Sequence, residues 1–144
     1  MALAKLCLID GLTLAERRIT FMCKLFIDAN TKLWETSARS IRIQGMVTSI
    51  RLEFHFWKVL EEIAERDALT IPEMINRLYS ESIDAGHDLS NFTSFLRVCA
   101  IRFIGLQLAG DIPVEKNVLI ASLDADAILR SEATRNRPLF KPMH

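Results

Sequence analysis

The chain has 144 residues, half of them hydrophobic and a quarter charged, and its 18 Lys and Arg residues balance 18 Asp and Glu residues. This composition indicates one soluble domain that can bury a core. The zero net charge excludes a general attraction to nucleic acid or anionic membranes, so any binding of phosphate must come from a local cluster of charges.

Cysteine usage and hydropathy indicate where the protein acts. Cys7, Cys23 and Cys99 lie far apart without a CxxC pair, which is typical of reduced thiols rather than of a disulfide framework. The N-terminal residues lack the basic start and cleavage site of a signal peptide. No apolar run approaches the roughly 20 residues that span a bilayer. We therefore expect a soluble, cytoplasmic protein without a membrane partner.

Residues 1–40 are interpreted as an N-terminal extension, with a helical pattern in TLAERRITFMCKLF and a polar end, NTKLWETSARS. Met22 is an alternative start, because the chain that follows it resembles a compact protein. An additional N-terminal helix is the other interpretation of this segment.

The stretch VTSIRLEFHFW, residues 47–57, changes its hydrophobic period partway. Up to Leu52 the residues alternate as in a strand with two unlike faces, and from Phe54 the apolar residues recur at helical spacing. This predicts a strand over about residues 46–52 and a helix over about 53–66. Since no partner strand is evident nearby, we expect the strands of two chains to pair antiparallel. Thr48, Ile50 and Leu52 would then face the helices, and Val47, Ser49 and Arg51 would face outward.

Start and stop signals predict the later helices. Thr70, Pro72 and Glu73 form a capping box with a proline in the first turn, so a helix should begin at residue 71 and end near Ala85–Gly86. Ser90 or Asn91 can cap a third helix, whose apolar residues cover more than one face and indicate burial on several sides. A weaker helix is expected within residues 118–130, followed by a mobile tail at 135–144.

The stretches RSIRIQGMVTSIRLEFHFWKVLEEIAERDALTIPEMINRLYSES and DLSNFTSFLRVCAIRFI together resemble the ribbon-helix-helix DNA-binding proteins over about residues 39–104. The second stretch is similar to a bacterial subgroup with a further helix. The resemblance implies a mainly α fold: one short strand that pairs in a dimer ribbon, two core helices, and one or two more. The domain would occupy residues 41–110 and a C-terminal segment 111–144. The family usually has glycine in the inter-helix turn, where this chain has Ala68.

The resemblance also implies DNA-binding residues. Ribbon residues that read bases in the major groove correspond to Val47, Ser49 and Arg51. The phosphate clamp, where helix N–H groups favour an anion, corresponds to Thr70 and Ile71. Arg39 and Arg42 make the ribbon segment basic and are expected to contact phosphates. The dimer core is expected to contain Ile50, Leu52, Trp57, Leu60, Ile63, Ile75 and Leu78.

Catalytic and metal sites are not predicted. Glu81, Asp84 and His87 are spaced by three, but they include one imidazole and lie at a helix end. Cys23 or Cys99 could pair with His55 or His87, but no orienting third group follows at a recognisable spacing. Glycine-rich phosphate loops and GxSxG are absent from the sequence. We expect a protein that is not an enzyme and has no cofactor.

Together these features predict a homodimeric, sequence-specific DNA-binding protein, a transcriptional regulator that represses by occupying an operator. The alternative is a dimeric protein-interaction module of the same fold, antitoxin-like or an adaptor, with weak or no DNA binding. Such a module would bind its protein partner through the third helix or the C-terminal segment.

Overall fold

The computed structural model describes residues 23–137. The chain divides into two units, Met1–Trp34 and Glu35–His144. In the first unit, residues 23–27 are helical and η1 (Thr31–Trp34) is a short 3-10 helix. The predictions that concern Cys7, the start at Met22 and most of the C-terminal tail lie outside the described residues. Among the helices of the described part, none is both long and apolar enough to span a membrane.

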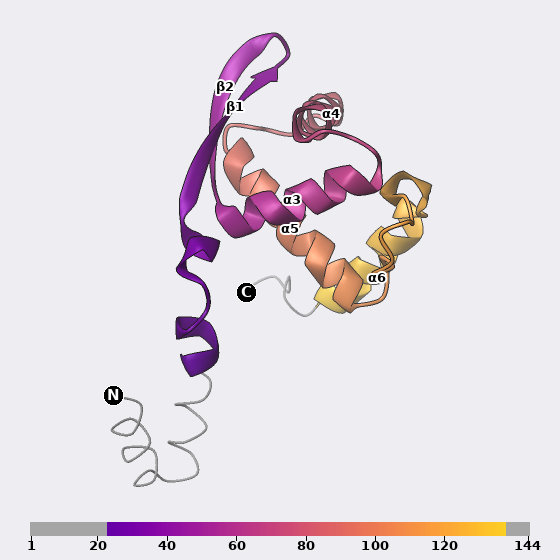
Figure 1. Cartoon of the computed structure of the whole chain (residues 1–144). Helices are drawn as coiled ribbons and strands as arrows, with labels where there is room; N and C mark the ends of the chain where they lie inside the picture. The colour runs from indigo at the N-terminus through magenta and orange to yellow at the C-terminus, as the bar shows by residue number, and fades with distance from the viewer. Residues whose placement is uncertain (1–22, 138–144) are drawn as a thin grey trace, which may run out of the picture. The chain divides into compact units, whose positions relative to one another are not determined.

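The second unit begins with a β-hairpin (Figure 1). Strand β1 (Thr36–Ile43) pairs antiparallel with β2 (Met46–Glu53), from Thr36 opposite Glu53 to Ile43 opposite Met46. The two-residue turn has φ of 47° at Gln44 and 84° at Gly45, the positive values that the favoured hairpin turns require. Asn76 fixes the turn, since its Nδ2 donates to the Arg42 carbonyl over 2.7 Å and its Oδ1 accepts from the Gln44 N–H over 3.2 Å.

The hairpin corrects two expectations from the sequence. The partner of β2 is β1 of the same chain, so the ribbon does not need a second chain. The ribbon also begins at Thr36, inside the segment that was interpreted as an N-terminal extension. The hydrophobic pattern did not reveal the first strand because only Ile41 and Ile43 of its eight residues are buried.

Four helices and a 3-10 turn follow the hairpin. They are α3 (Phe54–Arg66), α4 (Ile71–Asp84), α5 (Phe92–Leu108), η2 (Ile120–Ser122) and α6 (Ala125–Asn136). The capping box of α4 is present, because Thr70 Oγ1 accepts from the Glu73 N–H and Glu73 Oε2 accepts from the Thr70 N–H. Asn91 caps α5 and Asp124 caps α6. The mainly helical ribbon-helix-helix architecture with further helices is thus confirmed.

The core lies between the inner face of the hairpin and the helices, and it is complete within one chain. Leu52, Trp57, Leu60, Ile75 and Leu96 are the largest side chains with essentially no exposed surface. Burial of each stabilises the fold by roughly 1.5–3 kcal/mol. The indole Nε1 of Trp57 donates to the Ser37 carbonyl over 3.0 Å, which joins α3 to β1.

Five of the seven residues expected in a dimer core lie in the core of a single chain. Ile50, Leu52, Trp57, Leu60 and Ile75 are buried inside a single chain, while Ile63 and Leu78 are partly buried and pack against the same core. A side chain without exposed surface cannot contact a second protomer. Thr48 also departs from the expectation, because it is exposed near the hairpin turn rather than covered by helices.

The segment after α5 is tied to the helical body by α3. The buried guanidinium of Arg66 donates to the carbonyls of Pro113 over 2.7 Å and Val114 over 3.1 Å. The Asp67 carboxylate accepts from the Ile120 N–H over 2.7 Å. Ion pairs between Arg102 and Glu132 and between Arg135 and Asp111 hold α6. Thus residues 111–136 are an integrated part of this unit.

The turn between α3 and α4 has a strained backbone at Ala68, whose φ is 54°. A Cβ is unfavourable in this left-handed region, where glycine is the residue that fits without strain. We expect Ala68→Gly to raise the free energy of unfolding by about 0.5–1 kcal/mol, net of the entropy that glycine adds to the unfolded chain. Urea denaturation measures the change. Ala85, with φ of −79°, is the matched control, and Ala85→Gly should give no gain.

Candidate nucleic-acid interface

The outer face of the hairpin brings together the three residues expected to read bases. Val47, Ser49 and Arg51 are exposed on β2 and alternate with the buried Ile50 and Leu52. Their partners across the ribbon are Arg42, Ser40 and Ala38, which are also exposed. The six side chains, which we call the ribbon face, are thus Ala38, Ser40, Arg42, Val47, Ser49 and Arg51.

Two members of the ribbon face were not predicted from the sequence. Ala38 and Ser40 carry no distinctive chemistry, and their position is defined only by pairing with Arg51 and Ser49. Because these two side chains are small, they project little from the ribbon face. The two arginines, Arg42 on β1 and Arg51 on β2, lie diagonally across the ribbon from each other. The signal that could have identified them is the pairing register of β1 with β2, which decides which alternate residues of β1 face outward.

The two arginines of the ribbon face carry charge that the described residues do not neutralise with a carboxylate. Arg51 Nη1 lies 3.4 Å from Thr36 Oγ1, and Arg42 Nη1 donates to the Gly45 carbonyl over 2.8 Å. The neighbouring acid, Glu53, is instead held by Arg97 of α5 through contacts of 2.9 and 3.2 Å. The Arg97 hydrogen bonds lower the pKa of Glu53. The ribbon face is therefore locally basic although the whole chain is neutral.

Arg39, which was expected to contact a phosphate, lies on the helix-facing side of the ribbon, opposite the ribbon face and Arg42. Its guanidinium carbon sits 4.4 Å from the centroid of the Trp57 ring, and its Nη2 lies 2.8 Å from Glu61 Oε1. Because alternate residues of β1 face the same side, Arg39 shares a face with the buried Ile41 and Ile43. On this face it contacts Trp57 and Glu61 of α3. This arginine covers the buried indole, and its charge is paired with Glu61.

The N-terminus of α4 lies close to the hairpin turn, where a clamp for phosphate was expected. Asn76 connects the two, since its amide donates both to the Pro72 carbonyl and to the Arg42 carbonyl. The Glu73 carboxylate accepts from the Thr70 N–H over 2.7 Å and from its hydroxyl over 2.9 Å. Pro72 has no N–H, which leaves Ile71 as the donor that could meet a phosphate.

Glu73 places a negative charge at this helix end. The hydrogen bond from the Thr70 N–H, followed by that from its hydroxyl, lowers the pKa of the Glu73 carboxyl. The carboxylate thus stays ionised at neutral pH and competes with a phosphate for the same positive helix end.

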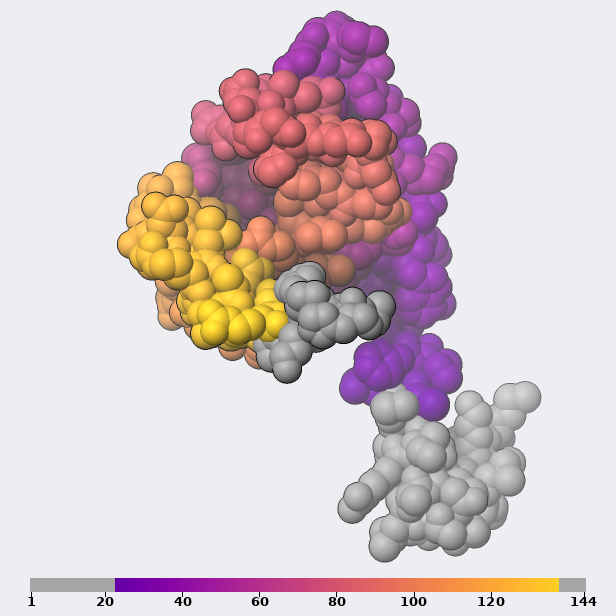
Figure 2. Space-filling model, turned by 180° about the vertical axis from the view of Figure 1, so that it is seen from behind, coloured from indigo at the N-terminus to yellow at the C-terminus, as the bar shows by residue number. Residues whose placement is uncertain are grey.

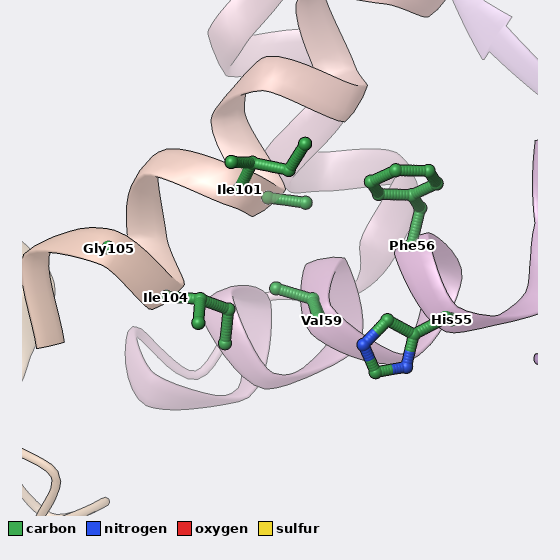
Figure 3. Close-up of a pocket in the computed structure, with 7 residues that line it drawn as sticks. His55, Phe56, Val59, Ile101, Ile104 and Gly105 are labelled. Atoms are coloured by element: carbon green, nitrogen blue, oxygen red, sulfur yellow. The ribbon is translucent and has the colours of Figure 1, made fainter. Parts of the chain in front are cut away.

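No group of three His, Cys, Asp or Glu side chains in the described part of the chain could hold a metal ion, so Glu81, Asp84 and His87 do not form a site. Cys99 is half-buried, and burial raises the pKa of its thiol. His55 is exposed at the start of α3. It lines a hollow of about 320 Å³ between α3 and α5, whose other lining residues are apolar or glycine (Figure 3).

Seen from behind, the hairpin runs along one side of the helices of this unit (Figure 2). A ribbon that stands beside its helical support can be approached from its outer side. The ribbon face is therefore the candidate surface for binding a nucleic acid.

Comparisons with known proteins agree with this architecture. Residues 36–104 match the family model described as ribbon-helix-helix domain, and the match begins where β1 begins. The solved structure of an uncharacterized protein from Bordetella pertussis Tohama I is similar at 50% sequence identity and a TM-score of 0.73, over 76% of this chain and 87% of that chain. No curated protein matches. The family typically binds DNA and dimerises. The chain belongs to the ribbon-helix-helix domain family.

Proposed function

We propose that the protein is a homodimeric, sequence-specific DNA-binding protein of the bacterial cytoplasm, which regulates transcription by occupying an operator. The observation that carries the proposal is the ribbon face, with two arginines free of carboxylate partners among the described residues. A two-stranded ribbon fits the major groove of B-DNA. Ile41, Ile43, Ile50 and Leu52 anchor β1 and β2 in the buried core, which reduces the order that must be gained on binding.

Five of the six ribbon-face side chains suit a contact with DNA. Arg51 can donate two parallel hydrogen bonds to O6 and N7 of guanine, and Ser40 and Ser49 can donate to or accept from base edges. Val47 can contact the methyl group of thymine. Arg42, near the turn, reaches outward from the other strand and suits a phosphate. In these assignments Arg51 contributes most to base recognition, and the smaller side chains each add a weaker contact.

The hairpin changes the expected stoichiometry of recognition. Since both strands belong to one chain, each protomer presents a complete ribbon, and a dimer presents two. Two ribbons related by a two-fold axis would read two half-sites in inverted repeat, and matching faces of the duplex recur about every 34 Å. One shared ribbon would instead read a single site across the axis.

Selection of bound duplexes from random DNA tests the function. We expect an inverted repeat of a short motif that contains guanine, and an affinity that falls steeply with salt concentration because counterions are released from the phosphates. Selected duplexes without a common motif, bound with little salt dependence, would refute the proposed function.

At the N-terminus of α4, we expect Glu73→Gln to strengthen DNA binding a few-fold. Glutamine can keep the capping box with Thr70, while the substitution removes the charge that competes with phosphate at Ile71. Titration of a labelled duplex at several salt concentrations measures the gain. Glu81→Gln, at an exposed position near the other end of α4, is the control. An equal gain in both variants would indicate a general charge effect.

The second candidate is a protein-interaction module that uses this fold without strong DNA binding. Exposed apolar side chains on α5 favour it, since Val98, Ile101 and Leu108 are at least half exposed. A mainly apolar protein interface depends weakly on salt, whereas DNA binding depends on it steeply. The salt titration above therefore separates the two functions.

A further inference from the structure

Glu53 places a negative charge at one end of the ribbon. Alternate residues of a strand face the same side, so Glu53 shares a side with Arg51, two positions earlier on β2. The outward positions of the two strands are Thr36, Ala38, Ser40 and Arg42 on β1 and Val47, Ser49, Arg51 and Glu53 on β2. Glu53 is the one acid among these outward residues. Its carboxylate is therefore the group that could neutralise an arginine of the ribbon face.

Arg51 is within reach of the Glu53 carboxylate. Two residues of a strand advance the chain by about 7 Å, a distance that the long side chains of arginine and glutamate can span together. The guanidinium of Arg51 already extends toward this end of the ribbon, because its Nη1 lies 3.4 Å from Oγ1 of Thr36. Thr36 is the residue opposite Glu53 across the ribbon. A Glu53 carboxylate without another partner would therefore compete with DNA for Arg51.

Arg97 of α5 holds this carboxylate instead. Nε of Arg97 donates to Oε2 of Glu53 over 2.9 Å, and Nη2 donates to Oε1 over 3.2 Å, so both carboxylate oxygens accept from one guanidinium. A paired contact of this kind is stronger and more directional than a single one. The two side chains are 33% and 27% exposed, and an ion pair that is partly buried is screened less by salt. Arg51 is thus left without an acidic partner among the described residues.

We propose that Arg97 is a positioning residue for DNA recognition, which keeps Arg51 available to DNA by holding the Glu53 carboxylate. The inference rests on the proposed function, because it concerns the ribbon face that binds DNA there. Arg97 acts through Glu53 and contacts neither a base nor a phosphate. Helix α5, which follows the two core helices, thereby takes part in recognition at a distance of 44 residues along the chain.

Substitutions of the two partners should have opposite effects on DNA binding. Arg97→Ala should weaken binding to the selected duplex about two- to five-fold for each ribbon, the range that an exposed ion pair between Glu53 and Arg51 can offset. Glu53→Gln removes the competing charge and should bind at least as tightly as the parent. The double variant, Arg97→Ala with Glu53→Gln, should recover the affinity that Arg97→Ala loses. An ion pair with only a structural role would behave differently, because its loss from either side would weaken binding alike.

Arg102→Ala is the matched control on the same helix. Arg102 also holds a carboxylate, since its Nε donates to Oε1 of Glu132 on α6 over 2.9 Å. The control therefore removes one positive charge from α5 and releases one carboxylate, but that carboxylate does not belong to the ribbon. Its effect on affinity measures the general influence of charge and should be smaller than that of Arg97→Ala. Fluorescence anisotropy at one salt concentration gives the affinities of the full chain, and circular dichroism verifies that each variant is folded.

A measurement without DNA separates the inference from the proposed function. The nitrogen-15 NMR signal of the Arg51 Nε–H group, assigned by its absence in Arg51→Ala, should shift in Arg97→Ala as the guanidinium pairs with Glu53. It should return toward its parent position in the double variant. An unchanged signal in Arg97→Ala would overturn the inference even if the protein binds an operator.

Two results with DNA complete the test. A double variant that binds as weakly as Arg97→Ala would overturn the inference, because it would show that Arg97 itself contacts DNA. A parent chain that selects no preferred duplex would overturn the proposed function, and the Arg51 signal would still decide whether Arg97 keeps Glu53 from pairing with Arg51.

Discussion

Replacing Arg51 by alanine should weaken binding to the selected DNA site strongly and leave the fold intact. Arg51 is exposed on the ribbon face, and among the described residues its side chain makes only a long hydrogen bond to Thr36 Oγ1. A paired contact with guanine is worth about 1–3 kcal/mol, so each half-site should lose roughly 5- to 150-fold in affinity. Binding to random DNA should fall less, because it loses only one phosphate-attracting charge.

Two further variants make the measurement specific. Arg51→Lys keeps the charge but loses the planar fork that matches guanine, so it should resemble alanine on the selected site and the parent on random DNA. Lys58→Ala removes a basic side chain of α3 that is 60% exposed and lies off the ribbon face, and it should affect both DNAs equally. Fluorescence anisotropy gives the affinities. Equal binding of the selected site by Arg51→Ala and the parent would rule out base reading by this arginine.

Most of the elements after residue 45 could be predicted because their signals are local. The capping box at Thr70 and Glu73, the cap at Asn91 and the alternation around Ile50 each lie within a few residues of the element they define. Strand β1 could not be predicted in this way. Its inward positions include Arg39, and what holds it is pairing with β2 and the Trp57 indole, both distant in sequence.

The candidate site follows the same division. The alternation of residues along β2 correctly separated the outward-facing Ser49 and Arg51 from the buried positions. A shift of one residue in this alternation would exchange the two faces of the strand. Arg39 was expected on the DNA side because strand β1 was not predicted, so it was unknown which of its residues face outward. Periodicity also cannot say whether a buried residue such as Trp57 contacts its own chain or a partner. Only the three-dimensional packing distinguishes these cases.

The largest effect on stability is expected at Leu52, where aspartate should unfold the domain. Leu52 has no exposed surface, and the residue opposite it is Ser37, which offers no positive charge. Ile50 is a less clean position for this test, because Arg39 lies opposite it and could pair with an introduced carboxylate. A buried, unpaired carboxylate costs several kcal/mol, comparable with the roughly 5–15 kcal/mol that stabilise a domain of this size.

The pH dependence of Leu52→Asp has a definite sign. Burial disfavours the charged form, so the folded-state pKa of the new carboxyl would lie above the unfolded value of about 3.9. The penalty is smallest below the unfolded pKa, where both states are protonated, grows as the pH rises from the unfolded to the folded pKa, and is constant above the folded pKa, where both states are ionised. Circular dichroism melts should therefore show part of the lost stability, relative to the parent at the same pH, restored in acid.

Ser49→Asp is the matched control on the same strand, three residues away and on the opposite face. Because Ser49 is exposed, this aspartate remains hydrated and should change the free energy of unfolding by less than about 1 kcal/mol. It would, however, place a negative charge on the ribbon face and abolish DNA binding. One substitution thus removes the fold and the other removes only the binding. If Leu52→Asp remained folded at neutral pH with the parent's melting temperature, the inner face of the hairpin would not be the buried one.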